Sequence, residues 1–205
     1  MLKLYLPFEY NKTFRVSQIF GVNPHIYKRF GLEAHNGTDW ACPAKTLICA
    51  IADGQIIGVG NEGWSTGYGK YIKIQHEGYQ STYGHLKSFL VKIGDQVKQG
   101  RGLGLSDNTG FSTGAHLHLT LKETDIQGNV LNRDNGYFGA ITSLPLLNMP
   151  PNPELIPSSW SKEQWDFWVK NKVLSEQSLP RATMTKEEFA VILRNYDDYR
   201  NKLGK

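Results

Sequence analysis

Short apolar runs, separated by Gly, Asn and Asp, fill the chain from about residue 14 to residue 121. Residues 70–75 alternate between apolar and polar side chains with period two, which predicts a strand with one buried face. Similar runs predict strands at residues 47–52, 55–59, 80–83 and 116–121, a strand–turn–strand unit at 91–100, and a short strand after Gly102 and Gly104. Strands this short and closely spaced are typical of antiparallel sheets, so we predict a mainly β fold.

The pattern changes after residue 143. Residues 144–157 contain five of the nine prolines, which is too many for a regular element and predicts a linker lying on the domain surface. Further on, Trp160, Trp165 and Trp168 recur at helical spacing, and a second helix is predicted to start at a capping box at residues 185–188. The sequence therefore divides into a domain at 1–143, a Pro-rich linker at 144–157 and a small helical hairpin at 158–205.

Composition and charge narrow the class of protein. The chain has 205 residues, with 40% hydrophobic and 20% charged residues, as expected for a soluble globular protein. The net charge of +4 is mild and contains no block of like charges, so we predict no nucleic-acid partner. A weakly cationic protein can still favour an anionic surface such as a bacterial wall.

The N-terminal residues 1–10 lack the apolar core of about 7–15 residues that an export signal needs. No apolar run approaches the roughly 18 residues of a membrane-spanning helix. We therefore expect synthesis in the cytoplasm without a signal peptide and no membrane insertion.

The two cysteines, Cys42 and Cys49, do not form a CxxC pair, which argues against a cysteine zinc site. They can form a disulfide only if the fold brings their Cα atoms within about 7 Å. Two buried free thiols are the simpler expectation.

Four of the six histidines lie in three short motifs, which are HxxxD at residues 35–39, YGHL at 83–86 and HLH at 116–118. Imidazole and carboxylate groups are the ligands of catalytic Zn²⁺, which takes three protein ligands and keeps one position for water. On a strand, both rings of an HxH motif point to the same face. In HxxxD, Gly37 lets the chain turn so that both ends reach one ion.

Each motif alone is weak evidence, because a surface His and Asp often fall four residues apart. The three motifs together, with their Gly and Thr neighbours, predict a metal site. His25 and His76 have no such partner and are assigned to surface or supporting roles.

Residues 34–121 resemble the catalytic domain of the lysostaphin/LytM-type zinc endopeptidases, which cut peptides of bacterial peptidoglycan. The matching phrases lie at residues 35–39, 53–55, 67–76, 82–86, 91–100 and 108–118. The resemblance implies one Zn²⁺ ion, peptidoglycan as the partner, and a groove between antiparallel sheets in a duplicated-hybrid-motif-like fold.

The resemblance also implies roles for individual residues. His35, Asp39 and His118 would bind the zinc, and His85 and His116 would be an unligated catalytic pair. One of the pair would act as general base, and the other would stabilise the oxyanion or protonate the leaving amine, without an assignment of which does which. Tyr27 is a candidate for the tyrosine that the family often places near the site.

Other functions fit the same fold. A non-catalytic wall-binding or regulatory module would lack one or more zinc ligands, whereas the full set is present here. A phage tail component or a phage lysin would explain the absence of a signal peptide.

The helical tail faintly resembles one unit of an S-layer-homology module, although packing on the peptidase domain or on a second subunit is the simpler expectation. The bond that is cut stays open among glycine cross-bridges, D-Ala-to-diamino-acid links and stem-peptide bonds.

Overall fold

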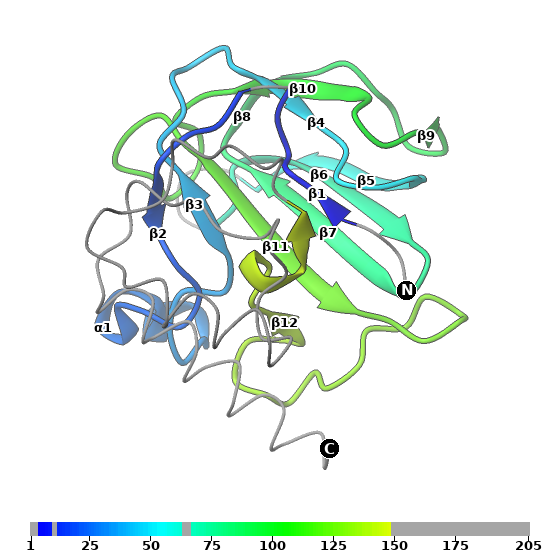
Figure 1. The fold of residues 1–205 in the computed structure, drawn as a ribbon. Coiled ribbons are helices and arrows are strands. Elements are labelled where there is room, and N and C mark those ends of the chain that lie inside the picture. The colour runs from blue at the N-terminus through cyan, green and yellow to red at the C-terminus, as the bar shows by residue number, and fades with distance from the viewer. Residues whose placement is uncertain (1–3, 10–11, 63–66, 149–205) are drawn as a thin grey trace, which may run out of the picture.

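The computed structural model describes residues 4–9, 12–62 and 67–148, and Figure 1 shows their arrangement. The largest sheet has eight strands, in the order β2-β3-β11-β7-β6-β5-β9, with β12 paired to β11 beside this path. Its strands are β2 (Val16–Gln18), β3 (Thr38–Trp40), β5 (Gly54–Asn61), β6 (Lys70–His76), β7 (Tyr79–Gly84), β9 (Gln96–Val97), β11 (Leu117–Glu123) and β12 (Ala140–Ile141).

A three-stranded sheet, in the order β4-β10-β8, lies over one face of the large sheet (Figure 1). Its strands are β4 (Leu47–Cys49), β8 (Leu86–Phe89) and β10 (Gly102–Ser106). Every pairing in these two sheets is antiparallel. The prediction of a mainly β, antiparallel fold is confirmed.

The core lies between the two sheets. Ile48, Leu86 and Leu103 of the small sheet pack in one buried cluster with Ile72 and Ile74 of β6. Leu117, Leu119 and Leu121 of β11 join the same cluster, each completely buried. Burying one such side chain contributes about 1.5–3 kcal/mol, so the leucines fix β11 firmly. Because side chains alternate along a strand, His118, Thr120 and Lys122 must lie on the other face of the sheet.

Helical structure is short in the described part of the chain. It consists of α1 (Pro24–Tyr27), η1 (Lys28–Phe30) and η2 (Leu144–Leu146). The helices α1 and η1 were not predicted from the sequence. Pro24 occupies the first helical position of α1, and Gly31 ends η1 with a left-handed backbone. The predicted strand–turn–strand unit at 91–100 contains only the short strand β9. No helix among the described residues is long and apolar enough to cross a membrane.

The ends of the described region pair with each other. The strand β1 (Leu4–Tyr5) pairs in parallel with β13 (Leu147–Asn148), and Leu144 and Leu147 are buried in the core. The first residues of the predicted linker, 144–148, therefore pack on the domain. The boundary after residue 143 stays a prediction, and the predicted helical tail lies outside the described residues. Cys42 and Cys49 are buried free thiols, as expected.

Candidate metal centre

Two paired strands and the loop before one of them bring the candidate ligands together. In the antiparallel pair of β3 and β11, His118 lies directly opposite Asp39, and on its other side β11 places His118 opposite Gly84 of β7. Side chains of directly opposed residues point to the same face of a sheet. His35 lies in the loop that leads into β3, and the three side chains converge on one point.

The three potential ligand atoms form a small, buried triangle. His118 Nδ1 lies 2.8 Å from Asp39 Oδ1 and 3.0 Å from His35 Nε2, and the third edge, from His35 Nε2 to Asp39 Oδ1, is 3.2 Å. All three residues are buried. Nitrogen and oxygen ligands about 2.0–2.1 Å from one tetrahedral Zn²⁺ lie about 3.3 Å apart, so the triangle suits such an ion.

The outer contacts of the two imidazoles support this fit. His35 Nδ1 lies 2.8 Å from the carbonyl oxygen of Ile19, which can only accept, so Nδ1 carries the proton and Nε2 offers a lone pair. The Nε2 atom of His118 lies 2.9 Å from the Thr120 hydroxyl, which can accept its proton and leave Nδ1 free. Metal-ligating histidines are commonly held by such second hydrogen bonds.

The charges of the triangle point the same way. Burial alone would raise the pKa of Asp39, but the neighbouring His35 and His118 outweigh burial and hold that pKa well below its usual range. Burial lowers the pKa of His118, although the Asp39 carboxylate opposes this shift. With Asp39 ionised and the ring protons on the outer nitrogens, the lone pairs of the three side chains are directed at one point, as the ligands of a cation site would be.

Gly37 explains how the HxxxD loop passes so close to β11. A Cβ atom at this position would lie 2.6 Å from Cε1 and Nε2 of His118 and 2.7 Å from the carbonyl oxygen of Leu119. Any larger residue would therefore push His118 or the strand away. The glycine between His35 and Asp39 makes room for the third candidate ligand.

His85 and His116 lie beside the triangle but outside it. Their ring centroids are 4.5 Å apart, and His116 Nε2 lies 3.6 Å from the second carboxylate oxygen of Asp39. His85 Nδ1 donates to the Thr109 carbonyl at 2.6 Å, and His116 Nδ1 donates to the Gly114 carbonyl at 2.8 Å. In its neutral form, each ring therefore carries its lone pair on Nε2.

The surroundings of His85 make it a weak base. Burial, followed by the positive charges that His118 and His116 can carry, lowers the pKa of His85 to about 3. His85 also has a left-handed backbone, with φ of 59°. Such a conformation is rare for a residue with a Cβ atom and often marks a functional site.

A cavity of about 470 Å³ opens over the triangle and the histidine pair. Ile26, Tyr27, Phe30 and Leu32 from the segment around α1 line it, with Phe111 also in the lining. This lining is mainly apolar, and its polar groups include Asp39, three histidines and Lys122, as is typical of a binding cleft.

Two tyrosines lie near the triangle. Tyr27, the predicted candidate, has its ring centroid 5.1 Å from that of His35, and its hydroxyl accepts a hydrogen bond of 2.7 Å from Gln18. Burial, followed by the negative charge of Asp39, raises the pKa of Tyr27. Tyr68 was not predicted from the sequence, and its hydroxyl contacts both Asn36 and Thr120 at 3.1 Å.

Thr120 was also missed, although the sequence contained a signal for it. Two residues after His118 on the same strand, it must share the face of the HLH motif. It links the Tyr68 hydroxyl to the His118 ring and so orients that ring.

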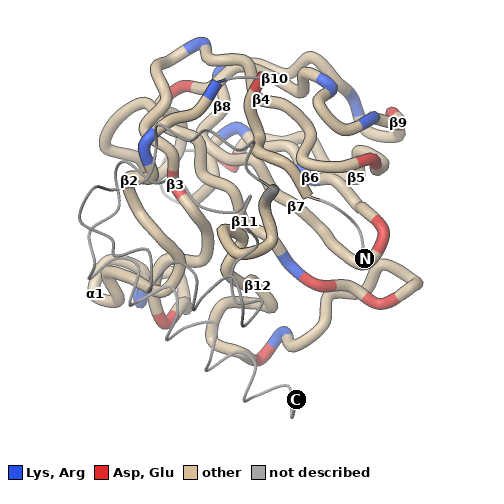
Figure 2. Tube along the Cα trace, in the orientation of Figure 1, with Lys and Arg blue, Asp and Glu red and all other residues tan. Residues whose placement is uncertain are grey.

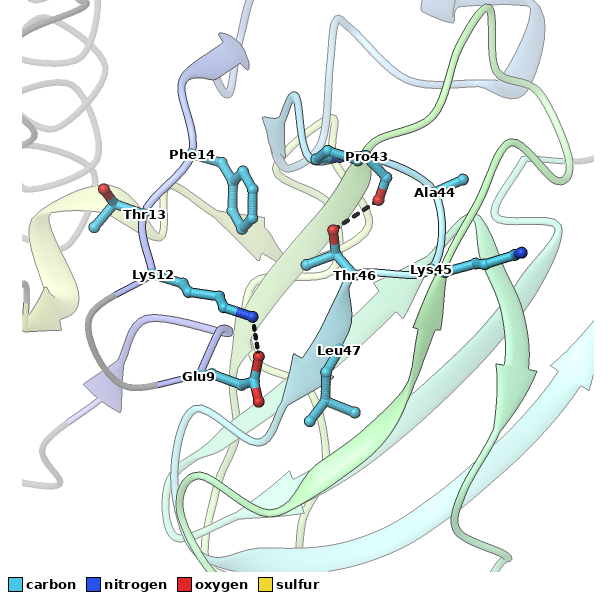
Figure 3. Close-up of a pocket in the computed structure, with 9 residues that line it drawn as sticks. All are labelled: Glu9, Lys12, Thr13, Phe14, Pro43, Ala44, Lys45, Thr46 and Leu47. Atoms are coloured by element: carbon cyan, nitrogen blue, oxygen red, sulfur yellow. Dashed lines mark hydrogen bonds and ion pairs between the residues drawn. The ribbon is translucent and has the colours of Figure 1, made fainter.

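A second hollow, of about 600 Å³, lies elsewhere on the domain (Figure 3). Glu9 and Lys12 form an ion pair there, and the Thr46 hydroxyl donates to the Pro43 carbonyl. No histidine lines it, and the candidate triangle lies beside the first cavity instead.

His25 and His76 lie away from the triangle. His25 is exposed in α1. His76 is buried in β6, where Nδ1 donates to the Asp53 carbonyl at 2.8 Å and Nε2 lies 2.7 Å from the Ser81 hydroxyl. These contacts give His76 a structural role.

The burial of His76 should make the stability of the fold depend on pH. Burial lowers the pKa of His76 in the folded chain, whereas in the unfolded chain it titrates near 6.5. The unfolded state therefore binds more protons below about pH 6.5, and the free energy of unfolding falls as the pH falls through this range. One group contributes a slope of at most about 1.4 kcal/mol per pH unit.

We expect His76→Gln to reduce the loss of unfolding free energy between pH 7 and pH 5, measured by denaturant titration. An unchanged slope would contradict this origin.

Comparison with known proteins agrees with the geometry. Residues 33–132 match the model of peptidase family M23. Among curated proteins, peptidoglycan DD-endopeptidase ShyA of Vibrio cholerae is 37% identical over 116 residues, which are 56% of this chain and 26% of ShyA. The chain spans about a fifth to a third of the length of the curated relatives it matches.

Solved structures show the same fold. A zinc-containing peptidase from Vibrio cholerae aligns with a TM-score of 0.53 and 27% identity, over 69% of this chain and 40% of that one. The catalytic domain of lysostaphin from Staphylococcus simulans aligns with a TM-score of 0.51 and 28% identity, over 64% of this chain and 90% of that one. The resemblance noted in the sequence is confirmed.

Proposed function

Because residues 33–132 form a domain of peptidase family M23, we propose that the chain is a zinc metallo-endopeptidase that hydrolyses peptide bonds in bacterial peptidoglycan. One observation carries the proposal: the side chains of His35, Asp39 and His118 form a buried triangle of potential ligand atoms. The triangle borders a cavity that two more histidines also line. A non-catalytic wall-binding module would need none of this convergent chemistry.

In this proposal His35, Asp39 and His118 hold one Zn²⁺ ion. Bound there, the ion polarises the scissile carbonyl and lowers the pKa of a water molecule. The Ile19 carbonyl and the Thr120 hydroxyl hold the two imidazoles in the orientation in which they would face the ion. The choice of zinc draws on the zinc-containing relative and on the nitrogen and oxygen ligand set.

We assign the general base to His116. Its Nε2 carries the lone pair that can take the proton of the attacking water, and it lies beside the triangle, 3.6 Å from the second carboxylate oxygen of Asp39. The ring can then return this proton to the leaving amine. His85, whose pKa is lowered to about 3, stays neutral and orients the attacking water by accepting a hydrogen bond at Nε2.

The proposal predicts that activity on walls depends on a metal ion. Purified peptidoglycan should lose turbidity with the protein, should stop doing so after a chelator removes the metal, and should recover when zinc is added back. Mass spectrometry of the released muropeptides should show new peptide termini and intact glycan strands. Sedimentation of the protein with walls, without release of any fragment, would contradict the enzyme and favour the wall-binding module.

A further inference from the structure

The face of the sheet that carries His118 continues beyond the metal centre. Thr120 and Lys122 follow His118 on the same face of β11, and Lys122 lines the cavity with Asp39 and the histidines. Thr82 of β7 is paired with Thr120 on one side and with Lys73 of β6 on the other. Lys73, Thr82 and Thr120 therefore form a row across three strands, on the face that His118 occupies.

Lys122 is the cation that lines the cavity, and two further cations lie near it. Lys73 and Arg133 are close enough to Lys122 to repel its positive charge. Figure 2 shows a basic segment near the end of β11 and another in the loop that follows it. Among residues 4–9, 12–62 and 67–148, no carboxylate forms an ion pair with any of the three side chains.

Lys122 is held in place rather than free in solvent. Its Nζ atom donates to the Phe138 carbonyl at 2.8 Å, which leaves two further N–H groups. Burial, and then repulsion by Lys73 and Arg133, lowers the pKa of Lys122 to about 8. A positive charge that is partly buried and lacks a counter-ion is stabilised by a bound anion.

From this arrangement we propose that Lys122, with Lys73 and Arg133, forms a subsite that binds a free carboxylate of the peptide substrate. The inference rests on the proposed function and deepens it by naming the substrate class. A glycine cross-bridge offers only neutral backbone amides to such a subsite. Stem peptides, whose acidic and diamino-acid residues carry free carboxylates, can form charge-assisted hydrogen bonds with the cations. The enzyme should therefore cut links between stem peptides.

Two synthetic cross-linked stem peptides test the subsite directly. They are identical except that the diamino acid at the cross-link carries a free carboxylate in one and a carboxamide in the other. We expect the wild-type chain to cleave the carboxylate peptide with kcat/KM about 10- to 100-fold higher, the range that one charged hydrogen bond supplies. Added salt should reduce this preference, because salt screens exposed charges.

Lys122→Gln should remove most of the preference by lowering kcat/KM for the carboxylate peptide only. The matched control is Lys92→Gln, which changes an exposed lysine outside the cavity lining and should keep the preference. A second variant, Lys73→Gln combined with Arg133→Gln, should also weaken the preference while leaving the Lys122–Phe138 contact in place. If Lys122→Gln folds poorly, this double variant tests whether the cations cause the preference for the carboxylate peptide.

The outcomes separate the two proposals. Cleavage of both peptides at equal rates by the wild-type chain would overturn the subsite and leave the endopeptidase intact, as would a preference that survives in both variants. Cleavage of neither these peptides nor a pentaglycine-linked substrate in the presence of zinc would overturn the proposed function itself. Faster cleavage of the pentaglycine-linked substrate than of the carboxylate peptide would overturn the assigned substrate class.

Discussion

His118→Ala is expected to empty the metal site, whereas His116→Ala is expected to keep the metal and lose turnover. His118 supplies one corner of the ligand triangle, 2.8 Å from Asp39 and 3.0 Å from His35. His116 lies two residues away on the same face, yet its Nε2 is 3.6 Å from the second oxygen of Asp39, outside the triangle of ligand atoms. Removing a general base lowers the rate by about 10²–10⁴-fold without removing a ligand.

The measurement is zinc per chain by elemental analysis, together with kcat on a cross-linked peptide. His118→Ala should lose both zinc and activity, and His116→Ala should bind zinc at wild-type stoichiometry with a kcat lowered by about 10²–10⁴-fold. His25→Ala is the control, since His25 is exposed and outside the cavity lining. If His116→Ala lost zinc as completely as His118→Ala, the division of the HLH motif into ligand and base would be wrong.

The sequence was sufficient to predict which residues share a face but not which strands meet. Period two in residues 116–121 predicted that His116 and His118 point the same way, and both do reach Asp39. Asp39 lies opposite His118 because of the register between β3 and β11. These two strands are far apart in sequence, so the pattern of residues does not predict their register. The grouping of the motifs therefore rested on ligand chemistry and on the family resemblance.

The residues that were missed are those whose role depends on distant contacts. Tyr68 matters because its hydroxyl lies between Asn36 and Thr120, from two other parts of the chain. The segment around α1 has no helical periodicity, since it is only four residues long, and so the apolar wall it adds to the cavity was not predicted. The alternation of side chains along β11 places Lys122 on the same face as His118, so its position was predictable from the sequence. Its lack of a counter-ion became visible only in the fold.

The second large effect is expected at the contact between two loops that hold His85. Gly69 and Gly110 both have left-handed backbones and lie back to back, so that a Cβ atom on Gly110 would lie 2.2 Å from the Gly69 nitrogen and 2.5 Å from its Cα atom. Around this contact, the Phe111 amide donates to the Gly67 carbonyl and the Lys70 amide donates to the Thr109 hydroxyl. No side chain at this position can be accommodated without separating the loops.

Both loops also hold His85. The Thr109 carbonyl accepts the Nδ1 proton of its ring at 2.6 Å, and the Tyr68 carbonyl accepts a hydrogen bond of 2.8 Å from its backbone N–H. Separating the loops at Gly110 therefore moves the neighbouring Thr109 carbonyl, and the His85 ring that donates to it rotates. A displacement of about 1 Å in a catalytic group can lower the rate by about 10²-fold. The metal ligands come from other segments, so zinc should remain bound.

Gly110→Ala is accordingly expected to lower both stability and kcat, and Gly78→Ala provides a matched control. Gly78 has nearly the same φ, 75° against 76°, but a Cβ atom there would meet nothing within 4 Å. In both variants the left-handed backbone lowers the free energy of unfolding by about 1–2 kcal/mol. Only Gly110→Ala adds a steric clash, which is expected to cost about 1–3 kcal/mol more. Denaturant titration measures the difference in the free energy of unfolding, and kcat of the zinc-loaded, folded protein measures the effect on His85. Equal stability and equal kcat in the two variants would show that the loop contact does not position His85, because the strain that they share would then account for the whole effect.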